Sequence, residues 1–324
     1  MEILDFEVLK TAVAWLSSGY EVSLATVVQT WGSAPRPPGS LLALRADGQV
    51  IGSVSGGCIE DDLIARIRQQ GSPPKPEWMQ YGVTRDQAQH FGLPCGGIIE
   101  LVVEPLHNPD WITEVMRHIA SHTLVKRTLN LTSGEVQLTA DAQDQPLTFN
   151  GEQLSMTFGP QRRLLLIGAG QLSQIVAQMV QPLGFNVLMC DPREEYTGTW
   201  QAAWGKHMAG MPDDVVREMK PDSHTAIVAL THDPKLDDMA LLEALKSAAF
   251  YVGALGSRVN NKNRRERLAL FDLTPQQIDR LHGPVGLHIG SRYPAEIALS
   301  ILAEIISVKN GITPSQKKEL YTSD

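Results

Sequence analysis

The chain has 324 residues, of which 43% are hydrophobic and 20% are charged, and this composition excludes a disordered or fibrous protein. Its net charge of −8 at pH 7, with no cluster of Lys and Arg among aromatic residues, argues against nucleic acid as a partner. An acidic start, three cysteines and no apolar run of membrane-spanning length predict a cytoplasmic protein with free thiols and no membrane partner.

The first half of the chain mixes predicted helices with predicted strands, and we expect it to form an α/β domain over residues 1–158. Apolar residues recur at helical spacing near the start, and alternating short runs separated by turns follow later. The predicted elements are a helix over 5–17, strands over 22–28 and 41–44, a hairpin turn at Asp47-Gly48, a helix starting near Cys58, a strand over 98–103, and short antiparallel strands between about 122 and 158.

The turn Gly56-Gly57-Cys58 is the first candidate binding site in this domain. Gly56 and Gly57 lack a Cβ, so the turn can adopt positive φ and a ligand can approach its backbone closely. Cys58 is expected at the start of a helix, where unpaired N–H groups and the helix dipole favour an anion. Three carboxylates follow within one turn, so we interpret Cys58 as a ligand or contact residue rather than a free nucleophile.

A second loop of the same kind contains Cys95, Gly96 and Gly97 and leads directly into a predicted strand. Two glycine-flanked cysteines can contact one ligand, or they can be small buried hydrophobic residues beside tight turns. Neither cysteine belongs to a C-x-x-C pair and no His pair stands at zinc-finger spacing, so the sequence does not predict a zinc site.

Arg36 stands in a proline-rich loop between two predicted strands. Its planar guanidinium suits a phosphate or another anion, so we include it among the candidate cofactor contacts. The alternative is a solvated surface arginine, which is common in such turns.

The second half changes to buried runs of the kind found in parallel strands, and we expect a doubly wound, Rossmann-like sheet over residues 159–312 with a tail over 313–324. The predicted elements are strands over 164–167, 187–190, 225–230, 251–255 and 285–289, and helices to about 180, over 236–246, after Thr274, and from Pro294 to about Gly311.

The first strand of this half is followed by a glycine turn that resembles a dinucleotide-binding fingerprint. Gly168, Gly170 and Gln171 form the turn and open the helix, where a pyrophosphate could bind to backbone N–H groups. Asp191 ends the next strand and could bind a ribose hydroxyl. Ser173 replaces the third Gly or Ala of the fingerprint.

Ligands of such sheets bind at the carboxyl ends of the strands, so polar residues that follow the strands are expected to converge. Gly256, Ser257 and Arg258 are candidate phosphate contacts there. His232 and Asp233 could carry out acid-base catalysis, although a His after a strand is more often a local hydrogen-bonding residue.

Taken together, several motifs resemble those of the XdhC/CoxI family, and the resemblance spans nearly the whole chain. The motifs are Gly32-Ser33-Ala34-Pro35-Arg36, Gly52 through Glu60, Gly92 through Gly97, the Gly168 turn, Thr231-His232-Asp233, Gly253 through Arg258, and Pro294 through Ser300.

The resemblance implies an accessory factor that binds the molybdenum cofactor, protects it during sulfuration and delivers it to a molybdenum hydroxylase. The cofactor would be the molybdopterin form or its dinucleotide, and Cys58 and Cys95 would be the matching thiols and candidate molybdenum ligands. Partners would be a xanthine dehydrogenase-like apoenzyme and a cysteine desulfurase, and we also expect a homo-oligomer. The Rossmann-like half would hold part of the cofactor or a separate nucleotide.

An NAD(P)-dependent oxidoreductase is the alternative that the sequence leaves open, because the Gly168 turn and Asp191 follow the dinucleotide pattern. Such an enzyme would need a general acid near the nicotinamide, and only His232 is a candidate. Arg193, close to Asp191, weakens the inference that the ribose is unphosphorylated.

Overall fold

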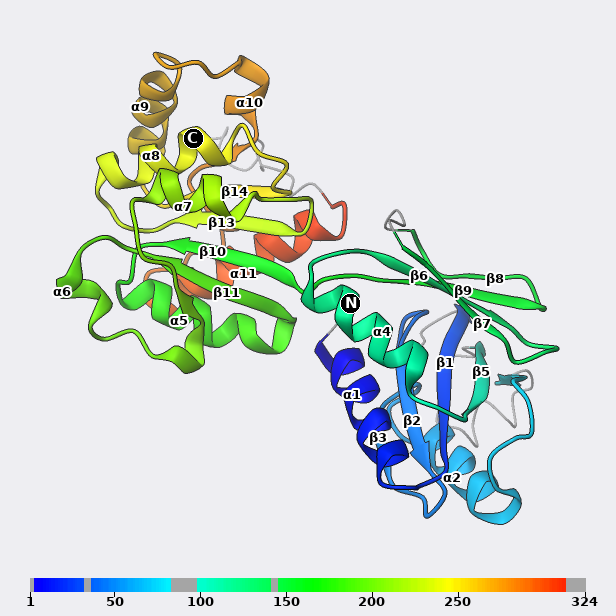
Figure 1. The fold of residues 1–324 in the computed structure, drawn as a ribbon. Coiled ribbons are helices and arrows are strands. Elements are labelled where there is room, and N and C mark those ends of the chain that lie inside the picture. Colours follow the sequence, from blue (N-terminus) through cyan, green and yellow to red (C-terminus); the bar gives the residue numbers. More distant parts are fainter. Residues whose placement is uncertain (1–2, 32–35, 83–97, 141–144, 313–324) are drawn as a thin grey trace, which may run out of the picture. The chain divides into compact units, whose positions relative to one another are not determined.

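The computed structural model describes residues 3–31, 36–82, 98–140 and 145–312, and the chain divides into two units, residues 1–161 and 162–324. The first unit contains two sheets and the second contains one, and each unit has its own clusters of buried apolar side chains (Figure 1).

The first unit is built on an antiparallel five-stranded sheet with the strand order β3-β2-β1-β5-β4. The long pair at its centre, β1 and β5, contains a register shift between Val27 and Gln29. The strands are β1 (Val22–Trp31), β2 (Leu41–Arg45), β3 (Val50–Gly52), β4 (Glu77–Tyr81) and β5 (Ile98–Leu106). The predicted hairpin turn at Asp47-Gly48 is confirmed, because β2 and β3 pair on either side of it.

Helices cover both faces of this sheet, as the alternation of side chains along its strands requires. The helix α2 (Cys58–Gln70) packs Ile59, Leu63 and Ile67 against one face, which confirms the predicted helical face. The helices α1 (Ile3–Ser17) and α4 (Asp110–Ala120) pack against the other face. The predicted first helix is confirmed, but its most buried residues are Val8, Leu9 and Ala12.

A second antiparallel sheet completes the first unit, with the order β7-β6-β9-β8. Its strands are β6 (Val125–Asn130), β7 (Val136–Ala140), β8 (Thr148–Phe149) and β9 (Gln153–Phe158), which confirms the short antiparallel strands predicted between 122 and 158. Leu129 and Leu154 of this sheet form an apolar cluster with Val28 and Val102 of the first sheet.

The second unit contains a parallel six-stranded sheet with the order β12-β11-β10-β13-β14-β15. The order reverses between β10 and β13, as in a doubly wound nucleotide-binding fold, and the predicted Rossmann-like sheet is confirmed. The strands are β10 (Arg162–Ile167), β11 (Phe185–Cys190), β12 (Lys206–His207), β13 (Thr225–Ala229), β14 (Tyr251–Ala254) and β15 (Leu281–His282).

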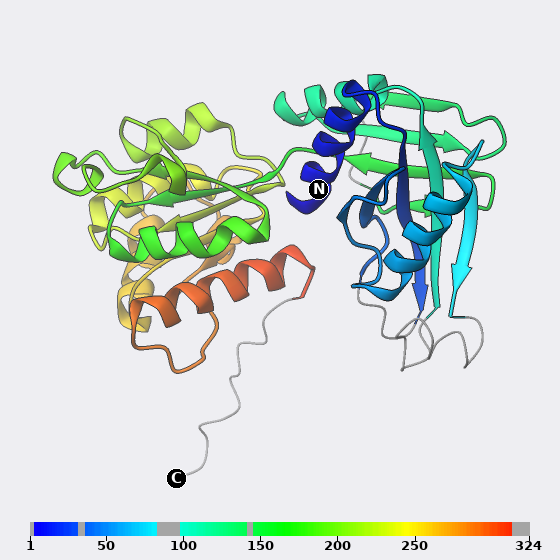
Figure 2. The ribbon, with the colours of Figure 1, turned by 90° about the horizontal axis from the view of Figure 1, so that it is seen from below.

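Helices lie on both faces of the parallel sheet. On one face α5 (Gln171–Val180) and α11 (Pro294–Lys309) pack side by side, and Figure 2 shows them in green and orange-red. The other face is covered by α7 (Pro212–Met219), α8 (Pro234–Ala244) and α9 (Arg258–Leu268). Shorter helical segments are α6 (Glu194–Thr197), α10 (Pro275–Asp279), η1 (Gln181–Leu183) and η2 (Ala202–Trp204).

The predicted strand over 285–289 is wrong, because the last strand of the sheet is β15, at Leu281–His282. Val285 is buried, so its position favours an apolar residue as a strand would. Its N–H donates to the Ala254 carbonyl at the end of β14. Gly286, with φ near 99°, then directs its own N–H to the Glu304 carboxylate on α11. The backbone of this segment therefore bonds to a helix after one contact with the sheet, and it does not form a ladder.

Candidate functional site

The Gly-Gly-Cys turn connects β3 to α2 and places Cys58 at the first position of that helix, as predicted. Gly56 and Gly57 have φ values of 90° and 151°, in the region that favours glycine, and both residues are exposed. Space around both is open, since a Cβ added at either position would meet no atom within 4 Å. The requirement for glycine here is therefore conformational.

The carboxylate of Glu60 lies at the centre of this turn and accepts hydrogen bonds from the residues before the helix. Its Oε1 accepts from the Ser53 hydroxyl at 2.8 Å and from the N–H groups of Val54 (2.8 Å), Ser55 (2.9 Å) and Gly56 (3.1 Å). Its Oε2 accepts from the Ser55 hydroxyl and from the Gly57 N–H at 2.9 Å.

These hydrogen bonds decide the protonation state of Glu60. Burial by itself opposes ionisation, but bonds from Ser55 and Ser53 outweigh it and lower the pKa of Glu60 to about 2. The turn thus forms a concave anion site that already holds a carboxylate of its own chain. The N–H groups of Gly56 and Gly57, directly before the helix, are therefore engaged by Glu60.

The second cysteine loop lies outside the described residues, and with it Cys95, Gly96 and Gly97. Arg36 is described and is partly buried, directly after the segment 32–35 that is not. Whether these residues contact the same ligand as Cys58 stays a prediction.

The candidate residues of the second unit follow four neighbouring parallel strands, β11, β10, β13 and β14. Parallel strands end at the same edge of a sheet, so the residues after them share that edge. They are Asp191 after β11, Gly168 and Gly170 after β10, His232 and Asp233 after β13, and Gly256, Ser257 and Arg258 after β14. We call this set the carboxyl-end edge; the helices α5, α8 and α9 also begin there.

Asp191 is buried at this edge and both of its carboxylate oxygens are engaged within the protein. One oxygen accepts from the backbone N–H and Nε of Arg193, at 3.1 and 2.8 Å. The other accepts from Arg193 Nη2 at 2.8 Å and from the Ala169 N–H of the glycine turn at 2.9 Å. Burial opposes ionisation, yet these bonds lower the pKa of Asp191. This arrangement does not fit a ribose of NAD(P) unless Arg193 moves away.

Ser173 of the fingerprint and Cys190 of β11 are both buried inside the second unit. Ser173 is 1% exposed on the first turn of α5, at the place of the third glycine. Cys190 lies in the core of the second unit, and burial raises the pKa of its thiol to about 12. A thiol with so high a pKa is not a nucleophile at neutral pH.

The residues after β13 have local structural partners. Asp233 is the N-cap of α8 and accepts from the Lys235 N–H at 2.9 Å. His232 is exposed and has a φ of 62°, which is uncommon for a residue with a side chain. Asp233 therefore caps α8. An acid-base pair of His232 with Asp233 stays a prediction.

The residues after β14 form the start of α9. Ser257 is its N-cap, and its hydroxyl accepts from the Asn260 N–H at 3.1 Å. Gly256 has a φ of 142°, and a Cβ there would lie 3.2 Å from the Asn261 side chain. Arg258 is exposed at the first position of α9, and its role as a phosphate contact stays a prediction.

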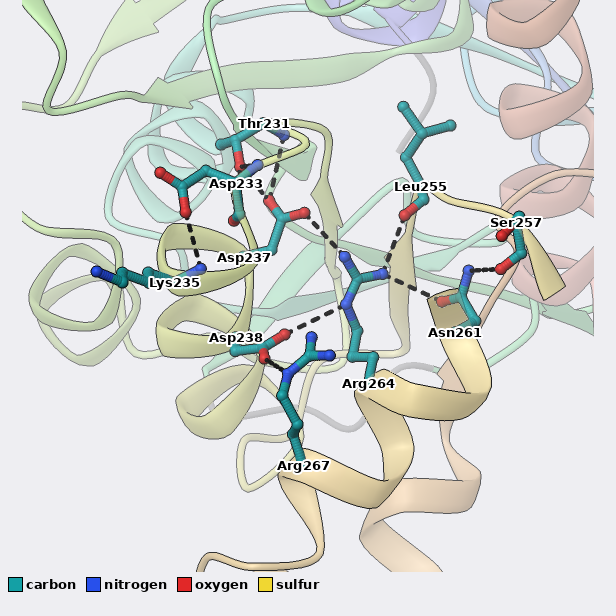
Figure 3. A network of polar contacts seen from close by, with 10 residues as sticks. All are labelled: Thr231, Asp233, Lys235, Asp237, Asp238, Leu255, Ser257, Asn261, Arg264 and Arg267. Carbon is teal, nitrogen blue, oxygen red and sulfur yellow. Dashed lines mark hydrogen bonds and ion pairs between the residues drawn. The ribbon is translucent and has the colours of Figure 1, made fainter. Parts of the chain in front are cut away.

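A buried polar network, which the sequence did not reveal, lies directly behind these loops (Figure 3). Arg264 of α9 is 5% exposed and pairs with Asp237 and Asp238 of α8 at 3.0 and 3.3 Å. Burial raises the pKa of Asp237, and bonds from Thr231 and Arg264 act in the opposite sense. The helix α9 has so few apolar residues that periodicity could not predict which face is buried.

Among the described residues, no three His, Cys, Asp or Glu side chains gather as ligands of a metal ion. In the same part of the chain, no helix is both long and apolar enough to cross a membrane.

Comparison with known families gives two matches along the chain. Residues 15–82 match the XdhC and CoxI family, and residues 164–305 match the XdhC Rossmann domain. The two matches together span more than half of the chain, and each falls within one of the two units.

Individual relatives resemble the chain over most of its length. A Bacillus subtilis protein, named as a probable subunit of xanthine dehydrogenase, is 29% identical over 92% of this chain and 96% of its own. A molybdenum cofactor insertion chaperone of Escherichia coli is 26% identical over 93% of this chain and 88% of its own. A crystal structure from Bacillus halodurans, named a xanthine dehydrogenase, covers 99% of both chains with a TM-score of 0.77 at 22% identity, which shows the same fold.

Proposed function

Because the chain belongs to the XdhC and CoxI family, we propose that it binds the molybdenum cofactor as cargo and delivers it to a molybdenum hydroxylase of the xanthine dehydrogenase type. The observation that carries this proposal is the similarity to a molybdenum cofactor insertion chaperone over 93% of the chain. Delivery to an apoenzyme, and a cysteine desulfurase that sulfurates the bound cofactor, are further parts of the proposal.

The Gly-Gly-Cys turn supports a role in holding the cofactor. Cys58 stands at the start of α2 on a turn that six hydrogen bonds to Glu60 fix in one conformation. A thiolate suits a soft, sulfur-rich metal centre, and a fixed turn presents it with little loss of conformational entropy on binding. We propose Cys58 and Cys95 as the thiols that contact the molybdenum end of the cofactor.

The carboxyl-end edge of the parallel sheet is proposed to hold a phosphate or nucleotide part of the cofactor, or a separate nucleotide. Three helices start there, and the unpaired N–H groups and dipole of a helix start favour phosphate. Arg258 adds a positive charge at one of these starts. The engagement of Asp191 by Arg193 weighs against the alternative of an NAD(P)-dependent oxidoreductase.

The first test of the proposal is whether the protein retains the cofactor. The protein is purified from cells that make molybdenum cofactor, and bound molybdopterin is measured as its fluorescent oxidation product. We expect binding well above background, and a loss of at least tenfold when Cys58→Ser and Cys95→Ser are combined.

Cys190→Ser is the matched control, because this thiol is buried in the core of the second unit and should not affect cofactor content. Background binding by the wild-type protein, or full binding by the double variant, would contradict the proposal. Transfer to a purified apoenzyme, followed by its recovered activity, then tests delivery separately.

A further inference from the structure

Arg264 joins two loops of the carboxyl-end edge through a single buried guanidinium (Figure 3). Its Nη1 donates to the Leu255 carbonyl at 3.0 Å and to the Asn261 side-chain oxygen at 3.1 Å. Asn261 in turn donates to the Ser257 carbonyl at 3.1 Å. On this side the guanidinium fixes the loop after β14, which carries Gly256 and Ser257.

The other side of the guanidinium fixes the loop after β13. Arg264 Nη2 donates to Asp237 Oδ2 at 3.0 Å. The second oxygen of Asp237 accepts from the hydroxyl and the N–H of Thr231, at 2.7 and 3.2 Å. The Thr231 hydroxyl accepts from the Asp233 N–H at 2.9 Å, so the chain of contacts extends past His232.

We propose that Arg264 and Asp237 are positioning residues for a phosphate-bearing nucleotide at the carboxyl-end edge. The two loops leave neighbouring strands, and a ligand that contacts both needs them at a fixed separation. A planar guanidinium donating to both sides sets that separation, which a lysine cannot reproduce because its ammonium lacks the fork. This inference rests on the proposed function, since it assumes a ligand at this edge.

The burial of the pair gives it a strong hold on the loops. Asp237 is fully buried and Arg264 is nearly so. Water does not compete for their hydrogen bonds there, and bonds between charged groups are therefore strong. Neither side chain reaches the edge itself, so both act through Thr231, Asn261 and the loop backbones.

Arg267 provides a matched control on the same helix. It binds Asp238 at 2.7 Å, the same residue that Arg264 contacts, but its side chain is 42% exposed and the structure gives it no bond to either loop among the described residues. Arg267→Lys therefore repeats the chemical change of Arg264→Lys one turn away.

The experiment is calorimetric titration of the full-length wild type, Arg264→Lys, Asp237→Asn and Arg267→Lys with CDP, ADP and inorganic pyrophosphate, with the Tm of each protein measured alongside. We expect the wild type to bind at least one probe. Arg264→Lys and Asp237→Asn should weaken binding of that probe at least tenfold, at a temperature where each variant remains folded. Arg267→Lys should change the affinity less than twofold.

Thr231→Val serves if the buried variants do not fold, since it removes one hydroxyl of the network and leaves the pair of Arg264 and Asp237 in place. It should weaken binding at least threefold. A lower Tm with wild-type affinity in the folded variants would show a purely structural role and overturn this inference alone. A wild type that binds none of the probes would overturn the nucleotide role of the edge, and this inference with it.

Discussion

At the scale of single residues, the most informative side chain is Glu60, which occupies the concave turn in front of α2. Such turns commonly bind external anions through convergent N–H groups. Here the anion is built into the chain three residues after the second glycine of the turn, which gives the motif from Gly52 to Glu60 a physical reason to end in glutamate. The chain itself thereby fixes the conformation of the turn.

The isosteric change Glu60→Gln tests this role. An amide keeps one acceptor oxygen but turns an NH2 group toward backbone donors, so at least one N–H loses its partner. We expect a loss of about 1–3 kcal/mol in the free energy of unfolding, measured by urea denaturation.

Asp61→Asn is the control, because Asp61 is exposed in the same helical turn and carries the same charge. Its unfolding free energy should stay within about 0.5 kcal/mol of the wild type. Equal stability of Glu60→Gln and the wild type would mean that the carboxylate does not hold the turn.

At the scale of elements, α11 is tied to the parallel sheet by a buried carboxylate. Glu304 accepts from the Tyr251 hydroxyl of β14 at 2.5 Å and from the Gly286 N–H at 2.7 Å, and its other oxygen lies 3.2 Å from His282 Nδ1 of β15. Burial opposes its ionisation, but bonds from His282, Tyr251 and Gly286 outweigh burial and lower its pKa.

This lowered pKa makes the contribution of Glu304 dependent on pH. A carboxyl with a folded-state pKa below its unfolded value stabilises the protein fully above the unfolded value, about 4.3, and loses that effect as the pH falls through the folded value. We expect Glu304→Gln to cost about 1–3 kcal/mol at pH 7, and the difference from the wild type to shrink below about pH 4. Urea denaturation of the wild type and the variant at a series of pH values measures the cost at pH 7 and its decrease at low pH.

Glu266→Gln is the comparison, because Glu266 is exposed on α9 and its ion pair with Lys262, the one contact it has within the described residues, is long at 4.0 Å. Glu266→Gln should change the free energy of unfolding little at every pH. A deficit in Glu304→Gln that stays constant from pH 7 to pH 3 would contradict the assigned pKa direction.

At the scale of the whole molecule, each unit buries its own apolar side chains. The first unit packs helices on both faces of its antiparallel sheet, and the second does so on its parallel sheet. A unit with a core of this kind can in principle fold alone. The domain limits at residues 158 and 312 stay predictions.

Separate production of residues 1–161 and 162–324 tests this independence. We expect circular dichroism to show one cooperative thermal unfolding transition for each half. Splitting 162–324 after Cys190 should leave the pieces 162–190 and 191–324 without cooperative unfolding, because the split separates β10 and β11 from β13. Non-cooperative behaviour of both 1–161 and 162–324 would contradict independent folding.

The sequence predicted the parts of the molecule that are encoded locally. The apolar runs of β10, β11 and β13 and the start of a helix after Thr274 are local signals, and the structure confirms them. Other elements were missed: β4 is short and half-exposed, and the inward face of α9 consists of Asn261, Arg264 and Leu268, so hydrophobic periodicity could not find it.

The sequence alone determined the class of each half, the order of most strands and helices, and the resemblance to one family, because periodicity and short motifs depend on neighbours along the chain. Only the tertiary structure decided the partners of the charged residues. Glu60 turned out to fill its own turn, Asp191 to pair with Arg193, and Arg264 to join two loops. The reason is physical: a charge that leaves water must find its partners in space, and spacing along the chain does not specify them.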